Sequence, residues 1–275
     1  MPFSLARLKN LTHTASSDHL ISIPEFFRTE PKSSTACTVP ARLEDVSSSR
    51  GPAGSKHCTL WKADRSPACR AVMMSLDAMN LSITEVDINM DKGEHRTQEM
   101  INLNPLQTLP IFKDRELVIS DSHAICTYLA GRYCDSGRLL PKDPGGRSIV
   151  DQHLHYSSSI IYPRFRAAAY PILYEHCNFV MPQQIVEIEF IYSDLECMLF
   201  KQTWFGGSWA TLSDIVFAST VSTLNVLVPV DKNKYPRLSN WLYRISEELY
   251  FITANRKGLN EFARRIGELA QIQQS

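Results

Sequence analysis

The sequence lacks a surplus of charge of either sign. Its 275 residues include 29 Lys and Arg and 29 Asp and Glu, which give a formal net charge of zero. A surface that binds nucleic acid normally carries a basic surplus, so no nucleic-acid partner is expected. No run approaches the roughly 18 consecutive apolar residues of a membrane-spanning helix, and the N-terminus lacks the apolar stretch of a secretory signal. The composition therefore predicts a soluble cytoplasmic protein with no membrane partner.

Patterns of metal-binding or disulfide-bonded residues are also missing. The seven cysteines are odd in number, widely spaced and free of any C-x-x-C pair, which indicates reduced thiols. Among the eight histidines, His153 and His155 would face different sides of a helix because they are two residues apart. No metal cofactor is therefore expected.

Residues 1–55 differ in composition from the rest of the chain. Clusters of Ser and Thr and scattered Pro occur there without a sustained helical or strand period, which predicts a disordered extension. Arg7 and Lys9, with no acidic residue before Asp18, also fit a mitochondrial presequence. A solvated tail and a mis-assigned start codon are the alternatives, and the sequence leaves all of them open.

Residues 56–133 alternate between strand and helix patterns. The segment 58–61 and the alternating segment 83–88 predict strands, and a helical pattern follows each of them, first after Ser66 and Pro67 and then over 94–103. Two apolar runs that flank a polar tetrapeptide predict a hairpin at 109–119, and a further helix opens at Asp121. The order βαβαββα predicts an α/β domain with a thioredoxin-like fold.

The second half of the chain has only helical patterns. Residues 134–146 are rich in Gly and Pro, which predicts a linker, and 147–275 are expected to form an all-helical domain. The expected helices are 147–176, 182–201, 211–228, 237–249 and 258–270. Thr211 and Asp214 have the spacing of a capping box, and starting a helix is expected to be their entire role.

Several short segments resemble the cytosolic glutathione transferases. They are 64–70 (DRSPACR), 102–105 (NLNP), 108–110 (TLP) and 121–129 (DSHAICTYL). That family joins a thioredoxin-like domain to an all-helical domain, and the resemblance covers about 56–270. The segments look most like the insect delta and epsilon classes, and Gly93-Glu94-His95 with 162–166 and 235–238 favours epsilon. The resemblance implies a homodimeric glutathione S-transferase with glutathione as co-substrate.

The resemblance implies that Ser66 is the catalytic residue. Glutathione conjugation needs a thiolate, and a free thiol with a pKa of about 8.5 is only slightly ionised at neutral pH. A hydroxyl at the start of a helix can donate to the incoming sulfur, and the helix N-terminus adds a favourable field. Pro67 at the first helical position fits this arrangement. The alternative is that Ser66 is only an N-cap.

Further residues match glutathione contacts of the family, namely His95, Gln107, Leu109, Pro110, Asp121, Ser122 and Arg166. The proline after Leu109 is cis in the family, which would expose the Leu109 backbone to the cysteinyl part of glutathione. Asp121 and Ser122 open a helix and would hold the γ-glutamyl group. Gln107 stands where the epsilon class usually has His, so a weaker hold on the glycine carboxylate is expected.

An aromatic stripe at 162–174 predicts the wall for the second substrate. The resemblance implies that Tyr162, Phe165, Ala169 and Leu173 line an apolar pocket, with Arg166 at its polar edge. The alternative is an ordinary core stripe, since aromatic residues at helical spacing are more often buried.

Three functions remain open at this point. The first is transfer of glutathione to apolar electrophiles in xenobiotic detoxification, including dehydrohalogenation, and the sequence does not separate conjugase from peroxidase activity. The second is a steroid-pathway enzyme of the epsilon class. That branch holds a sterol hydroxyl with an acid, and here Phe165 stands at the position. The third is a non-catalytic carrier of apolar ligands, which the replacement at Gln107 would suit.

Overall fold

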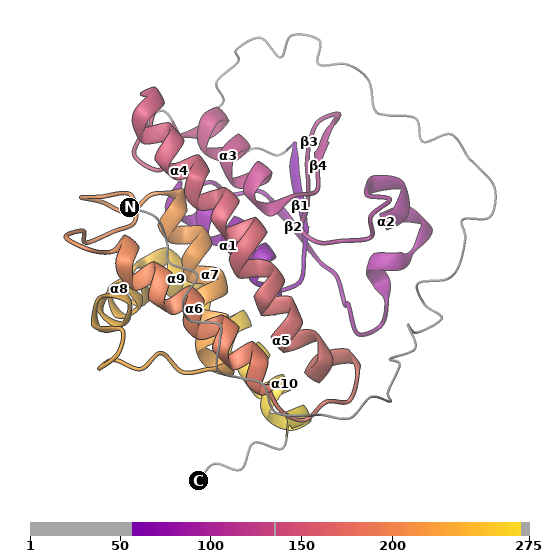
Figure 1. Ribbon diagram of the computed structural model, residues 1–275. Helices are drawn as coiled ribbons and strands as arrows, with labels where there is room; N and C mark the ends of the chain where they lie inside the picture. The colour runs from indigo at the N-terminus through magenta and orange to yellow at the C-terminus, as the bar shows by residue number, and fades with distance from the viewer. Residues whose placement is uncertain (1–56, 135, 271–275) are drawn as a thin grey trace. The chain divides into compact units, whose positions relative to one another are not determined.

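The computed structural model describes residues 57–134 and 136–270 (Figure 1). The predictions for residues 1–55 lie outside these ranges. The described residues belong to one compact unit, which contains a small sheet and a larger set of helices. Within these ranges, no helix combines the length and the apolar character that crossing a bilayer requires.

The sheet has the mixed topology that the strand pattern predicts. Its strands are β1 (Cys58–Lys62), β2 (Thr84–Asp87), β3 (Ile111–Asp114) and β4 (Leu117–Ile119), in the spatial order β2-β1-β3-β4. β1 pairs with β2 in parallel and with β3 in antiparallel orientation, and β3 pairs with β4 in antiparallel orientation. Leu60 and Phe112 are register partners and are fully buried, so their cross-strand pair anchors the sheet on the core. The thioredoxin-like topology is confirmed.

Helices cover both faces of the sheet. α1 (Pro67–Ala78) and α3 (Ser122–Tyr133) pack against each other on one side, and α2 (Gln98–Leu103) lies on the other side (Figure 1). The helix expected over 94–103 is divided at Thr97, whose extended backbone separates the 3-10 turn η2 (Glu94–Arg96) from α2. Ser66 and Asp121 are the N-caps of α1 and α3, so the predicted starts of these helices are confirmed.

The helical part contains α4 (Pro144–Tyr156), η3 (Ser157–Ile161), α5 (Tyr162–Tyr174), α6 (Pro182–Met198), α7 (Leu212–Leu227), α8 (Pro236–Ser246), α9 (Leu249–Ala254) and α10 (Arg256–Ala270). α4 begins inside the expected linker, because Pro144 occupies its first turn and Asp143 caps the Gly146 amide. The helix expected over 147–176 contains the π-helical stretch η3 just before Pro163, which has no N–H to continue an α-helical ladder. The short α9 is absent from the expected helices.

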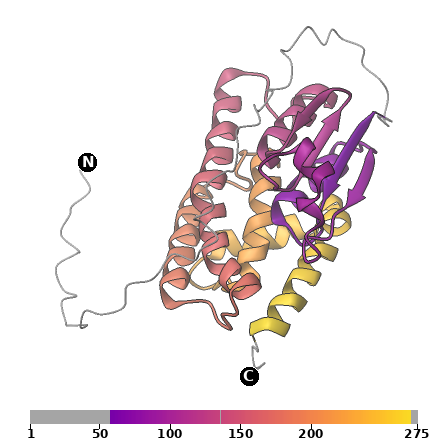
Figure 2. The same ribbon diagram turned by 90° about the vertical axis from the view of Figure 1, so that its right-hand side faces the viewer.

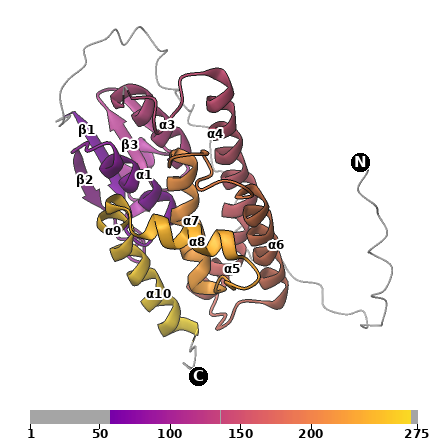
Figure 3. The same ribbon diagram turned by 90° about the vertical axis from the view of Figure 1, so that its left-hand side faces the viewer.

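Helix α7 lies between the two parts of the described structure. It packs against α1 from the sheet part and against α4 and α5 from the helical part. Figure 2 and Figure 3 show α7, in orange, between the strands and the layer formed by α4, α5 and α6. Every residue of 212–224 is buried, and one hydrophobic cluster joins side chains of both parts. The helix that Ser66 caps is therefore held by the core of the helical part.

The prediction that Thr211 and Asp214 only start a helix is wrong. They form the expected capping box at the N-terminus of α7. The Asp214 carboxylate also accepts hydrogen bonds from the Phe205 amide at 2.9 Å and from the Trp241 indole Nε1 at 3.0 Å. This buried carboxylate thus ties the loop before α7 and helix α8 to the start of α7.

Candidate functional site

The candidate site is centred on the loop between β1 and α1, where Ser66 caps the helix. The Ser66 Oγ accepts a hydrogen bond from the Cys69 amide at 3.4 Å, and Pro67 occupies the first helical position. A hydroxyl can donate as well as accept, and apart from the Cys69 thiol, which is a weak acceptor, no group of the described residues interacts with the Ser66 proton. Ser66 is half-buried, so a ligand can reach its hydroxyl. The Ser66 hydroxyl therefore caps α1 as an acceptor, and its own O–H remains able to donate to a ligand.

Cys69, in the first turn of α1, is a buried thiol. Its Sγ accepts a hydrogen bond from the Ala63 amide at 3.4 Å, and its side chain is fully buried. Burial raises the pKa of this thiol to about 11, so it stays protonated at neutral pH. Cys69 therefore offers no nucleophilic thiolate.

A second part of the site precedes β3, where the Leu109–Pro110 peptide bond is cis. Both residues are buried, and the Asn104 side-chain amide fixes the loop by donating to the Thr108 carbonyl at 2.9 Å. Within the described residues, the backbone N–H and C=O of Leu109 have no hydrogen-bond partner. A peptide-like ligand can pair with these two groups.

A third part is the start of α3. Asp121 is exposed, and its Oδ1 accepts a hydrogen bond from the Ala124 amide at 2.9 Å. Ser122 is the first helical residue and is half-buried. Free N–H groups at a helix N-terminus attract a carboxylate, and the carboxylate of Asp121 attracts an ammonium group. This end of α3 therefore suits a ligand that carries both groups.

His95 and Gln107 lie in different environments. His95 is only 7% exposed, and its Nδ1 has no hydrogen-bond partner. Burial lowers the pKa of His95, and the neighbouring Arg96 lowers it further, so the imidazole is neutral at neutral pH. Gln107 is exposed, and its φ of 55° lies in the left-handed region. The buried Nδ1 of His95 is the kind of polar atom that a ligand can satisfy.

Two of the residues predicted on α5, Phe165 and Ala169, belong to the core. They are 2% and 0% exposed, and the Phe165 ring packs against the ring of Phe262 in α10. They line no open surface, which corrects the prediction that they form a pocket wall. The physical reason is that α5 packs on α7 and α10 and turns this stripe inward. Tyr162 and Leu173 are half-buried and remain on the open side.

The open side of α5 carries four side chains at four-residue spacing, here called the α5 row, which consists of Tyr162, Arg166, Tyr170 and Tyr174. The Arg166 guanidinium lies over the Tyr170 ring, 4.6 Å from its centroid. The Tyr170 and Tyr174 rings meet edge to face with centroids 5.2 Å apart. These two tyrosines are absent from the predicted site residues, although the regular spacing from Tyr162 could have indicated them.

Electrostatic interactions connect the two ends of the α5 row to the loop between β1 and α1 and to the first turn of α1. Burial raises the pKa of Tyr162, and the Cys69 thiol is among the further contributors. Burial also raises the pKa of Tyr174, which interacts with Arg65 and Asp91. Those two residues form an ion pair with 2.6 Å between Nη2 and Oδ2. Tyr162 is thus within electrostatic range of the first turn of α1, and Tyr174 is within range of this ion pair.

Comparison with known proteins agrees with this geometry. Residues 56–131 match the N-terminal domain of glutathione S-transferases. Over 191 residues the chain is 38% identical to glutathione S-transferase 1 of Manduca sexta, an alignment that covers 69% of this chain and 88% of that protein. The chain belongs to the glutathione S-transferase family. It is accordingly an enzyme, with the two-part architecture that the resemblance implies.

Solved structures of insect glutathione transferases share the fold of this transferase. An epsilon-class enzyme from the housefly, Musca domestica, has a TM-score of 0.75 at 28% identity, and the match covers 77% of this chain and 97% of that one. A homologue from Drosophila mojavensis, solved with bound glutathione, has a TM-score of 0.75 at 31% identity with the same coverage, 77% and 97%. The described residues of the transferase therefore follow nearly the full length of these relatives.

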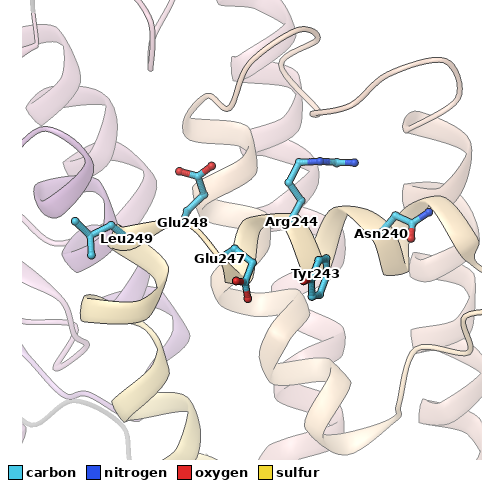
Figure 4. A pocket seen from close by; sticks show the side chains of 6 residues that line it. All are labelled: Asn240, Tyr243, Arg244, Glu247, Glu248 and Leu249. Atoms are coloured by element: carbon cyan, nitrogen blue, oxygen red, sulfur yellow. The ribbon is translucent and has the colours of Figure 1, made fainter.

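A surface hollow of about 490 Å³ lies on α8 and the start of α9 of the transferase (Figure 4). The side chains that line it are Asn240, Tyr243, Arg244, Glu247, Glu248 and Leu249. None of the predicted site residues is among them, so the hollow is no part of the candidate site. Neither there nor elsewhere in the described ranges do three or more His, Cys, Asp or Glu residues gather as metal ligands.

Proposed function

We propose that this transferase is an epsilon-class enzyme that ionises glutathione beside Ser66 and transfers its sulfur to apolar electrophiles, as in xenobiotic detoxification. The observation that carries the proposal is the available donor of the Ser66 hydroxyl at the N-terminus of α1. A donor at this position stabilises a thiolate, and the free N–H groups of the first turn add positive potential. Similarity to the housefly enzyme supports the class. The proposal includes a cytoplasmic homodimer, which rests on the family alone.

Three features support glutathione as the co-substrate. The backbone of Leu109 offers an unpartnered N–H and C=O to the cysteinyl residue. Asp121 and Ser122 at the start of α3 suit the ammonium and carboxylate of the γ-glutamyl residue. The buried Nδ1 of His95 has no hydrogen-bond partner, and the glycine residue of glutathione could supply one. The Drosophila mojavensis homologue, which was solved with glutathione, supports the same ligand.

The α5 row supports an aromatic or apolar electrophile. The tyrosine rings of the row and the half-buried Leu173 provide apolar surface, and Tyr162 is within electrostatic range of the first turn of α1. Arg166, at the edge, can stabilise negative charge on a leaving group or contact a glutathione carboxylate. The row contains no Asp or Glu, and Asp91 at its end is paired with Arg65. Because a carboxylate for a sterol hydroxyl is lacking in this row, detoxification is favoured over a steroid-pathway role.

Conjugation by the full chain tests the proposed function. We expect glutathione to react with an aryl halide at a rate that saturates with both substrates, and calorimetric titration to show one glutathione site per chain. Glutathione binding without turnover of aryl halides, alkyl halides or peroxides would indicate a carrier of apolar ligands instead. Absence of glutathione binding would contradict the proposal.

Replacing Gln107 by His is expected to lower the KM for glutathione about threefold, because an imidazole gives the glycine carboxylate a stronger donor than an amide. The φ of 55° at this position is one that His adopts readily. A contact that is equally strong in the ground state and the transition state changes KM alone, so kcat should stay the same. Steady-state kinetics with varied glutathione would measure both. Gln107→Ala is the matched variant and should raise KM. Equal KM values in both variants would remove Gln107 from the glutathione site.

A further inference from the structure

Arg70 is a buried cation in α1, the helix that Ser66 caps. It follows Ser66 by four residues, and its backbone N–H donates to the Ser66 carbonyl at 3.0 Å. Its side chain is 0% exposed. Charged side chains are almost never fully buried unless an opposite charge pairs with them. The groups that surround Arg70 therefore determine whether its positive charge is neutralised.

The hydrogen-bond partners of Arg70 are neutral. Its Nη1 donates to Oδ1 of Asn255, between α9 and α10, and its Nη2 donates to Oγ1 of Thr223 in α7. Its Nε has no partner. Within the described residues, no carboxylate forms an ion pair with this guanidinium. The Arg70 guanidinium is therefore hydrogen-bonded, but no negatively charged group neutralises its charge.

Asp64 interacts with Arg70 electrostatically but is already engaged by two lysines. The Nζ of Lys62 lies 2.6 Å from Asp64 Oδ1, and the Nζ of Lys257 lies 3.0 Å from Asp64 Oδ2. Those two cations offset the field that Asp64 exerts on its surroundings. Asp64 therefore does not serve as the counter-ion of Arg70.

Helix α10 packs directly on Arg70 and helps to exclude water. A Cβ added at Gly258 in α10 would stand 1.9 Å from the Asp64 carbonyl oxygen and 2.9 Å from Arg70 Cδ, so only glycine fits there. Burial lowers the pKa of Arg70 to about 9, which still leaves the guanidinium charged at neutral pH. An unpaired positive charge thus lies in low-dielectric surroundings near the first turn of α1.

We propose that Arg70 is a positioning residue whose unpaired charge, four residues from Ser66, stabilises the thiolate of bound glutathione across the first turn of α1. This inference rests on the proposed function of Ser66 and adds a second source of positive potential to it. Two unit charges roughly 10 Å apart, at an effective dielectric constant of about 20, interact strongly enough to lower the thiol pKa by about one unit. The thiolate supplies the negative charge that Arg70 lacks in the described chain.

Replacing Asn255 by Asp tests the charge and preserves the shape. The new carboxylate would stand where Asn255 Oδ1 now accepts from Arg70 and would pair with the guanidinium. We expect Asn255→Asp to raise the pKa of the glutathione thiol in the binary complex by about one unit. The ultraviolet absorbance of the thiolate, recorded against pH with the full chain, measures this value. The pH profile of kcat/KM should move by the same amount.

Thr223→Val is the matched control for packing. It removes the other hydrogen bond of the Arg70 guanidinium and leaves the charge unpaired. We expect the thiol pKa in this variant to equal that of the wild type, even if the melting temperature falls. An equal rise of the thiol pKa in both variants would show that Arg70 acts through geometry alone and would overturn the proposal.

The wild-type complex separates this inference from the function on which it rests. A thiol pKa that stays at the free value of about 8.5 would contradict the role of Ser66 itself. A depressed wild-type pKa that Asn255→Asp leaves unchanged would overturn the role of Arg70 and leave that of Ser66 intact. A depressed pKa that rises only in Asn255→Asp supports both roles.

Discussion

Replacing Ser66 by Ala is expected to lower kcat for glutathione conjugation by about 100-fold and to leave the KM for glutathione within about twofold of wild type. The Ser66 hydroxyl at the start of α1 is an available donor, so its loss raises the thiol pKa and reduces the ionised fraction. Glutathione would still bind, because the proposed contacts at Leu109 and at the start of α3 remain. Steady-state kinetics at about pH 6.5 and about pH 9 would measure the effect, and the deficit should shrink at the higher pH, where glutathione ionises unaided.

Two further variants at Ser66 separate the chemistry from helix capping. Ser66→Gly loses the hydroxyl but costs a helix N-cap only a few tenths of a kcal/mol, so it should be as slow as the Ala variant and more stable. Ser66→Thr keeps a hydroxyl and should retain much of the activity. A wild-type rate in the Gly variant would remove the hydroxyl from the mechanism.

Replacing Asp214 by Ala is expected to lower the free energy of unfolding by about 4 kcal/mol. The buried carboxylate accepts hydrogen bonds from the amides of Phe205 and Thr211, each at 2.9 Å, and from the indole of Trp241 at 3.0 Å. Alanine would leave these donors buried without an acceptor, and each such donor costs roughly 1–3 kcal/mol. Urea denaturation followed by far-ultraviolet circular dichroism would measure the loss.

Asp194 is the matched control for Asp214. Its carboxylate also accepts a hydrogen bond, from the Tyr156 hydroxyl at 2.7 Å, but the residue is exposed. Water can replace the lost partner, so Asp194→Ala should cost less than about 1 kcal/mol. Similar small losses in both variants would contradict the stabilising role assigned to the buried carboxylate.

The order of strands and helices around the sheet was predictable because its signals are local. Apolar alternation marks the strands, and the caps at Ser66 and Asp121 mark the helix starts. Pro163 shows where this reasoning stops. The same proline can end a helix, kink it or follow a π-helical stretch, and the outcome at η3 depends on how α4 and α5 pack against α7. The six residues of α9 are too few for a helical period to identify.

The structural place of a candidate site residue was predictable where the residue sits in a short motif and unpredictable where it depends on the rotation of a helix. Ser66 belongs to the first group. Phe165 and Ala169 belong to the second, since only the packing of α5 on α10 turns them away from the row that contains Arg166. The neutral hydrogen-bond partners of Arg70 could not be predicted either, because they come from helices that are distant in the sequence and no local pattern indicates that these helices pack together.

The position of α7 limits how the two halves of this fold can be exchanged during evolution. α1, which Ser66 caps, packs on α7, and so does α5, which carries the α5 row. The main hydrophobic cluster spans both halves. A recombination crossover within 134–146 would therefore join the sheet half to a foreign α7 and would change the support of α1 together with the α5 row. We therefore expect a chimera with a crossover in this segment to lose stability unless its α7 comes from the same protein as its α1.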